Sequence, residues 1–186
     1  MQRGTTLIEL LSALIIIALL LGIAAPAVSN LKNRSEATSR VNWIIGAVNY
    51  TRHAAISFNT TATLCPLKKT KDKNHCGRGW HQDLLIFADK NKDGRFNGRD
   101  YLIQTIPALD KKGTIKWRSF RNRQFLQITS HGYTNFQNGN FTYCSPTKDP
   151  ILSRQVVVNV QGRARVTHYH DDQGRRLDRK GKLLRC

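Results

Sequence analysis

The chain has 186 residues and a formal net charge of +18, because 30 Lys and Arg outnumber 12 Asp and Glu. Once a membrane segment is set aside, roughly 130 to 160 residues remain, enough for one domain with its own core but not for two. No hydrolase, phosphate-loop or zinc-protease motif occurs, so we expect no enzyme and no cofactor. The charge excess favours an anionic partner, such as nucleic acid or lipid headgroups.

An apolar segment dominates the start of the chain. From Leu10 to Ala25 only Ser12 and Gly22 interrupt the apolar side chains, and Pro26 follows. About 20 apolar residues span a bilayer as a helix, and this segment is close to that length. A secretory signal peptide has a shorter apolar segment of about 7 to 15 residues, with its cleavage site after it. A membrane-spanning helix is therefore predicted.

A simple membrane anchor does not explain two features at the start of the chain. Glu9 lies at its edge, where an ionised side chain is costly without a partner, and a Gly4-Thr5 junction precedes it. The sequence from Arg3 to Leu10, RGTTLIEL, resembles the class III leader of type IV pilins and pseudopilins. The resemblance implies cleavage between Gly4 and Thr5 by a prepilin peptidase and N-methylation of Thr5, although Thr5 replaces the usual phenylalanine. It also implies that Glu9 pairs with the N-terminal amine of a neighbouring subunit during assembly.

An amphipathic pattern continues after the apolar segment. Apolar residues recur at spacings near three and four, at Leu31, Val41, Ile44, Ile45, Val48 and Ile56, with Lys32, Arg34, Glu36, Arg40 and Arg52 largely between them. This pattern is typical of a helix with one buried face. We predict one helix of about 50 residues, bent or broken near Gly22 and Pro26, because proline removes a helix hydrogen bond. Its second half would pack on the head.

Short β-like segments separated by turn residues follow Thr60. The predicted strands are residues 61–64, 84–88, 101–106, 114–117, 125–129, 141–144, 155–160 and 164–169. The pairs Asp93-Gly94, Asn97-Gly98, Asn138-Gly139, Gln161-Gly162 and Gln173-Gly174 fit hairpin connections between them. The predicted fold class is α+β, a mostly antiparallel β-sheet head over one long helix. The expected segments are a leader (1–4), a membrane-spanning or filament-core helix (5–28), its amphipathic second half (29–58) and the head (59–186).

The head resembles the FimT/GspH minor pilins in several short elements. They are Leu64-Cys65, Cys76, Trp80, residues 85–94 and the Gly-Arg-Ala-Arg run at residues 162–165. The resemblance implies a type IV pilin-like fold with two β-sheets against the N-terminal helix. In FimT-like proteins that serve DNA uptake, the Gly-Arg-x-Arg element binds DNA, which implies such a role for Gly162, Arg163 and Arg165.

The four cysteines follow an exported anchor, and oxidising compartments favour disulfides. Four cysteines allow three pairings, among which sequence alone does not choose. We expect Cys65 with Cys76, closing a short basic loop, and Cys144 with Cys186, tying the C-terminus to the head.

Basic residues gather in two stretches. The first has no acid over 13 positions and carries Lys111, Lys112, Lys116, Arg118, Arg121 and Arg123 with Trp117 and Phe120 among them. The second, the tail of residues 161–186, carries Arg163, Arg165, Arg175, Arg176, Arg179, Lys180, Lys182 and Arg185 against three aspartates. A solvated face is the ordinary explanation of such a run. The size of the excess favours an anionic ligand instead.

Arg163 and Arg165 are the main predicted contacts with DNA. Two residues apart on a strand, they project to one side about 7 Å apart, which is near the ~7 Å repeat of phosphates along one DNA strand. The planar guanidinium binds phosphate through two hydrogen bonds, and Gly162 lets the backbone turn and approach closely. Phosphate contacts carry no sequence information, so the predicted binding is non-specific and weakened by salt.

Metal sites are weaker alternatives. Residues 89–100 match an EF-hand loop at Asp89, Asn91, Asp93, Gly94 and Asp100. Strand-like flanks, an Asp in place of the final Glu, and the basic residues Lys90, Lys92, Arg95 and Arg99 favour a polar turn held by Asp and Asn side chains instead of calcium. Zinc is a similarly weak alternative at two clusters, His168, His170, Asp171 and Asp172, and Cys65, His75 and Cys76.

The sequence thus predicts a minor type IV pilin of the inner membrane, with its head in the periplasm, that enters an extracellular pilus near the tip beside other pilins. There the basic residues would bind double-stranded DNA for natural transformation. The main alternative is a structural minor pilin or type II secretion pseudopilin that primes assembly without binding DNA. A calcium-stabilised adhesive pilin is a second alternative.

Overall fold

The computed structural model describes residues 6–69, 74–109 and 113–186. The predicted cleavage site at Gly4-Thr5 and the basic residues Lys111 and Lys112 lie outside these ranges. The chain divides into two compact units, Met1–Glu36 and Ala37–Cys186.

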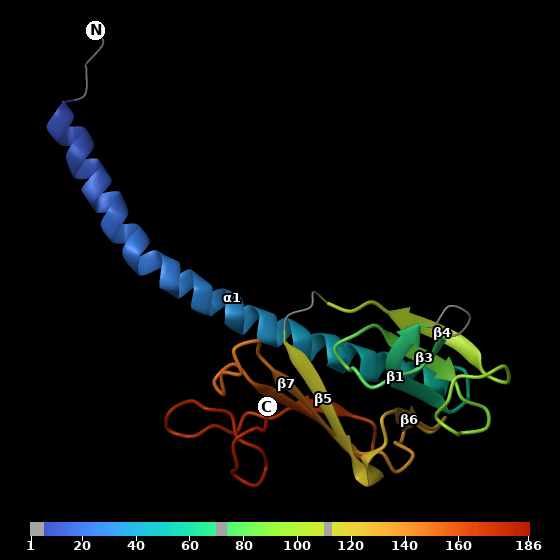
Figure 1. The fold of residues 1–186 in the computed structure, drawn as a ribbon. Coiled ribbons are helices and arrows are strands. Elements are labelled where there is room, and N and C mark those ends of the chain that lie inside the picture. Colours follow the sequence, from blue (N-terminus) through green and yellow to red (C-terminus); the bar gives the residue numbers. More distant parts are fainter. Residues whose placement is uncertain (1–5, 70–73, 110–112) are drawn as a thin grey trace. The chain divides into compact units, whose positions relative to one another are not determined.

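Helix α1 runs from Leu7 to Ser57 and is continuous through Gly22 and Pro26, so a break at these residues is not found (Figure 1). In the first unit its large apolar side chains are exposed, from Leu7 to Leu31. By length and composition the helix is apolar enough to cross a membrane. Exposed apolar side chains on a helix of this kind are what a bilayer or a filament core would cover.

The second half of α1 buries a face that is richer in small residues than the sequence pattern suggested. The buried residues are Ala37, Arg40, Val41, Ile44, Ala47, Val48, Thr51, Ala54 and Ala55. Of the predicted face, Leu31 and Ile56 are 68% and 45% exposed and so do not belong to it. Arg40, expected on the polar side, is only 3% exposed and donates from Nη1 to the carbonyl oxygen of Leu109 over 3.0 Å.

The first sheet has the antiparallel order β2-β1-β3-β4, and β6 also pairs with β1. Its strands are β1 (Ala62–Lys69), β2 (Asn74–Cys76), β3 (Leu84–Ala88), β4 (Tyr101–Ile106) and β6 (Leu126–Ile128). All were predicted except β2.

The second sheet has the antiparallel order β5-β7-β8-β9. Its strands are β5 (Thr114–Ser119), β7 (Gly139–Cys144), β8 (Arg154–Val158) and β9 (Ala164–Val166), and the short 3-10 helix η1 (Phe120–Asn122) follows β5. Strands β8 and β9 end earlier than predicted, at Val158 and Val166. The prediction of two antiparallel sheets against one long helix is confirmed.

The main core lies between the inner faces of both sheets and the buried face of α1. At its centre Trp117 stacks on Phe141 at 4.1 Å between ring centroids, and Trp80 meets Phe141 edge-on at 4.8 Å. Burying an aromatic side chain of this size contributes about 2–3 kcal/mol. A smaller cluster of Cys65, Leu67, Leu85 and Phe87 lies on the first sheet, with Phe96 and Phe125 against it.

Two disulfides join Cys65 to Cys76 and Cys144 to Cys186, with Cα atoms 5.4 and 5.6 Å apart. These are the pairs expected from the sequence. The second bond attaches the tail to the end of β7.

Candidate nucleic-acid interface

The outward face of the second sheet carries a row of polar and basic side chains. Along β5, Ile115 and Trp117 point into the core, so Lys116 and Arg118 between them point outward and are exposed. The strand register then places Arg118 beside Asn140, Asn140 beside Val157, and Val157 beside Arg165. Three strand spacings of about 4.8 Å separate the two arginines by about 14 Å.

Arg163 and Arg165 lie on one side of the β8–β9 hairpin. Ala164 between them is half-buried and packs against the main core, while both arginines are exposed. Because side chains alternate along a strand, the two arginines share the opposite side from Ala164. Arg165 belongs to β9, and Arg163 closes the turn that precedes it.

A five-residue turn recurs three times in this part of the chain, at residues 159–163, 171–175 and 178–182. In each, the Oδ1 atom of the first residue, Asn or Asp, accepts a hydrogen bond from the backbone N–H of the fifth residue, over 3.0, 2.9 and 2.9 Å. The fourth residue is a glycine with φ of 68°, 75° or 72°. The fifth residue is a cation, Arg163, Arg175 or Lys182. The turn chemistry therefore places one basic side chain at the end of each turn.

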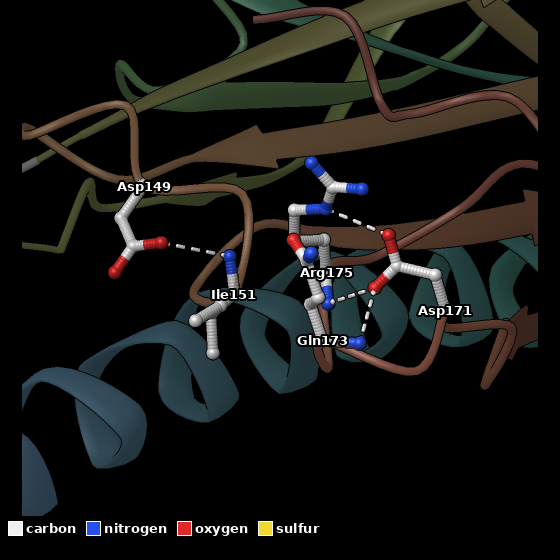
Figure 2. A network of polar contacts seen from close by, with 5 residues as sticks. All are labelled: Asp149, Ile151, Asp171, Gln173 and Arg175. Atoms are coloured by element: carbon white, nitrogen blue, oxygen red, sulfur yellow. Dashed lines mark hydrogen bonds and ion pairs between the residues drawn. The ribbon is translucent and has the colours of Figure 1, made fainter.

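The middle turn neutralises part of its own charge. Figure 2 shows the Asp171 carboxylate accepting hydrogen bonds from the N–H groups of Gln173 and Arg175 over 3.1 and 2.9 Å, and from Arg175 Nε over 2.7 Å. Burial acts to raise the pKa of Asp171, but the hydrogen bonds and charge of Arg175 outweigh it and hold the pKa below its ordinary value. A second Asp turn in the same view joins Asp149 to the N–H of Ile151 over 2.8 Å.

The last of the three turns contributes to a groove on the outward face of the second sheet. Residues 178–185 lie over β5, β7 and β8 and leave between them a groove of about 860 Å³, which we call the tail groove. In the part of the chain that the structure describes, its charged lining consists of the basic Lys116, Arg118, Arg179, Lys180, Lys182 and Arg185 and the acidic Asp178. The Cys144–Cys186 bond and a hydrogen bond from Lys116 Nζ to the Cys186 carbonyl oxygen hold the tail in this place.

Asp178 is hydrogen-bonded within its own turn. Its Oδ1 accepts the N–H groups of Lys180 and Lys182 over 2.8 and 2.9 Å. The N–H of Lys182 is the largest cause that lowers the pKa of Asp178, ahead of the N–H of Lys180 and the charges of the two lysines. The carboxylate is thus ionised at neutral pH and engaged with its own turn.

Other predicted contact residues lie outside the tail groove. Arg121 and Arg123 are exposed in and after η1, each with its guanidinium 5.6 Å from a ring centroid, that of Phe120 and Phe125 respectively. Arg163 and Arg165 are also outside the groove lining. Arg176 is half-buried, and its backbone N–H bonds the Pro150 carbonyl oxygen.

The polar floor of the tail groove was not predicted. Asn140, Thr142 and Gln155 line it from β7 and β8. Their alternation along each strand was visible in the sequence. The order of the strands was not, and the register places Thr142 beside Lys116, Asn140 beside Arg118, and Gln155 beside Thr142.

The loop at residues 89–100 bonds its acidic groups internally. Asp89 is fully buried, and its Oδ2 accepts hydrogen bonds from Thr63 Oγ1 (2.8 Å), Gln127 Nε2 (2.7 Å) and the N–H of Gly94 (2.9 Å). Burial raises the pKa of Asp100, whose Oδ2 accepts the N–H of Asn97 over 2.9 Å. These contacts are those of the polar turn favoured by the sequence analysis.

The metal candidates gain no support from the positions of their side chains. Within residues 6–69, 74–109 and 113–186, no three His, Cys, Asp or Glu side chains gather as a metal site. Cys65 and Cys76 share a disulfide and are not free thiolates, which zinc requires. His168 and His170 are exposed.

Comparisons with known proteins agree with the fold. A family model described as type II transport protein GspH matches residues 40–162. Two crystal structures of the type IV minor pilin FimU from Pseudomonas aeruginosa PAO1 are similar. The one in space group P65 has 17% identity, covers 70% of this chain and 91% of that chain, and has a TM-score of 0.52. The one in P21 has 16% identity, covers 74% and 92%, and has a TM-score of 0.53. No curated protein matches the sequence.

Proposed function

Because the chain belongs to the GspH family and so has the role of a minor pilin or pseudopilin, we propose that its head captures extracellular double-stranded DNA for uptake in natural transformation. In this role the chain is cleaved between Gly4 and Thr5 by a prepilin peptidase, and Thr5 is methylated. It rests in the inner membrane through α1 and then joins other pilins in an extracellular type IV pilus near its tip. Glu9 pairs with the N-terminal amine of a neighbouring subunit.

The observation that carries the DNA assignment is the gathering of outward-facing cations on one sheet face. Arg118 and Arg165 end a row across four strands, and Arg163 lies in the turn that joins β8 to β9. Arg118 and five further cations line the tail groove. The ~14 Å across the row compares with the ~12 Å width of the DNA major groove, so the two arginines can contact phosphates on both strands.

The tail accounts for much of this surface. The family match ends at Gly162, so Arg163 and the basic residues after it lie beyond the matched region. Arg121, Arg123, Arg175, Arg176 and Arg179 extend the surface or attract DNA to it, since steering by charge does not need direct contact.

The test measures the affinity of the full chain, in a non-ionic detergent, for a labelled duplex of about 20 base pairs. The salt concentration is varied. Replacing Arg163 and Arg165 together by Gln should weaken binding about tenfold at ~0.1 M salt and lower the salt slope by about 2. The matched control replaces two exposed cations elsewhere, Arg99→Gln and Lys148→Gln. Equal affinities of the Arg163/Arg165 variant and the unaltered chain would overturn the assignment.

A second candidate function is supported by the family match itself, whose description names a type II transport protein. In that case the chain primes filament assembly, and its charge contacts acidic neighbouring subunits. The same titration separates the two functions. If the unaltered chain does not retard the duplex even at ~50 mM salt, the structural function remains and DNA capture does not.

A further inference from the structure

A second basic groove lies on the first sheet, where no contact residue was predicted apart from Arg123. It has a volume of about 870 Å³ and lies between the β1–β2 region, the turn at residues 92–95 and residues 123–125. We call it the loop groove. Among the described residues its charged lining consists of the basic Lys68, Arg78, Lys92, Arg95 and Arg123 and the acidic Asp93.

The five cations are available to a ligand. All five are exposed, and in the described parts of the chain no carboxylate forms an ion pair with any of them. Arg123 lies near the Phe125 ring, 5.6 Å from its centroid, which holds one guanidinium beside the groove without neutralising it. Five like charges around one concave site raise the local concentration of anions.

In the turn that supplies Lys92 and Arg95, the acidic groups are hydrogen-bonded within the loop, and the two basic side chains are exposed. Asp93 Oδ1 accepts the N–H of Arg95 over 2.7 Å, and its Oδ2 accepts Asn91 Nδ2 over 2.9 Å. Asp89 is buried beneath the turn. Lys92 has a φ of 58°, and Gly94 packs so closely under Phe125 that an added Cβ would lie 2.3 Å from the ring. The backbone therefore fixes where the two cations emerge.

We propose that the loop groove binds phosphate groups of a nucleic-acid backbone, as a second DNA contact separate from the tail groove. The proposal rests on the proposed function for its ligand. The segment that matches a calcium loop in sequence would thus bind an anion instead of a cation. Its carboxylates stabilise the turn, and its basic side chains contact the ligand. Three arginine guanidinium groups and two lysine ammonium groups line the groove, and these are the groups that phosphate recognition uses.

The first test compares two variants of the full chain in non-ionic detergent. Lys92→Gln with Arg95→Gln removes two groove cations, and Arg99→Gln with Lys148→Gln removes two exposed cations that do not line either groove. The groove variant should bind a labelled duplex about tenfold more weakly at ~0.1 M salt, with a salt slope smaller by about 2, while the control changes little. Equal losses in both variants would overturn the proposal, because they would show a general charge effect.

The second test locates the contact by acetylation of lysines with and without duplex, read by mass spectrometry. Protection of Lys68 and Lys92, with Lys148 still reactive, is the expected result. Protection of Lys180 and Lys182 alone would overturn the loop groove and leave the proposed function standing. Protection of Lys68 and Lys92 without protection of Lys180 and Lys182 would support the loop groove and overturn DNA contact at the tail groove. Equal protection by inorganic phosphate at the same phosphate concentration would overturn the nucleic-acid assignment, because the groove would then be a general anion site.

Discussion

Gly162 packs directly against the carbonyl oxygen of Gly132, so that a Cβ on Gly162 would lie 2.6 Å from that oxygen. The same oxygen accepts a hydrogen bond from Arg52 Nε of α1 over 3.2 Å. The β8–β9 turn, the turn before Tyr133 and the helix therefore meet at one point. The glycine of the Gly-Arg-x-Arg element has a structural task there, which is to bring the turn that carries Arg163 close to the helix.

Replacing Gly162 by Ala should destabilise the protein by about 1–3 kcal/mol, because the new side chain meets both an unfavourable φ of 68° and the Gly132 oxygen. Gly174→Ala is the matched control. Gly174 has a φ of 75° in an equivalent turn, but a Cβ there has nothing within 4 Å. Denaturant unfolding should show the larger loss for Gly162→Ala. Equal losses would mean that close packing at Gly162 contributes nothing.

Removing the Cys144–Cys186 bond by Ser at both positions should cost about 4 kcal/mol in the chain-entropy model, since the bond closes a sequence separation of 42 residues. It should also free the tail from the outward face of the second sheet. Trypsin should then cut at Arg179 and Lys180 faster than in the unaltered chain.

The control for this prediction is Cys65→Ser with Cys76→Ser, which opens a separation of only 11 residues and should cost about 3 kcal/mol. Cleavage of the tail should be unchanged in that variant under conditions where both proteins are folded. If both pairs of substitutions speed tail cleavage alike, the tail is held by general stability and not by its own disulfide.

The turn at Asp178 should weaken in acid. Because the N–H of Lys182 and the other contacts lower the pKa of Asp178 from 3.8, the ionised carboxylate stabilises the folded turn above that pH. This contribution is lost as the pH falls through the lower, folded-state pKa. Hydrogen exchange at the Lys182 amide should accelerate there relative to the intrinsic rate. Asp178→Asn keeps an acceptor for the turn without a titrating group, so its exchange should show no such step.

Glu9→Ala should leave membrane insertion intact but reduce the amount of the chain in sheared filaments about tenfold or more, because the charge partner of a neighbouring N-terminal amine is lost. Glu9 is exposed in the first turn of α1, so the substitution removes no core contact. Glu9→Asp retains the charge and should retain more assembly. Wild-type amounts of the Ala variant in filaments would contradict the role assigned to Glu9.

The strands could be predicted because their signals are local. Residues 84–88 and 101–106 were predicted with the bounds of β3 and β4, since apolar and β-branched runs between turn residues define them. Strand β2 was missed because its three residues, Asn74–Cys76, are too few to show alternation, and its place depends on pairing with β1.

The remaining differences depend on contacts between distant residues. Arg40 resembles a solvent-facing residue in the sequence, but the approach of Leu109 buries it. All six basic residues of the tail groove were identified from charge alone, whereas their grouping required the β5–β7–β8 register. The loop groove was not predicted because Lys68, Arg78, Lys92 and Arg123 are far apart in the chain. In addition, the calcium-like pattern of residues 89–100 was interpreted through its acidic residues and not its basic ones.

The three turns at residues 159–163, 171–175 and 178–182 separate the charge of this surface from its folding. Each turn uses the backbone N–H of its fifth residue. The side chains of Arg163 and Lys182 are exposed, whereas Arg175 also pairs with Asp171 through Nε over 2.7 Å. Exchanging Arg163 or Lys182 for a neutral residue would change the surface potential at little cost in stability, whereas exchanging Arg175 would also remove its ion pair with Asp171. A pilin head of this kind could be adapted between a DNA ligand and a protein neighbour through a few such exchanges, with no rearrangement of the fold.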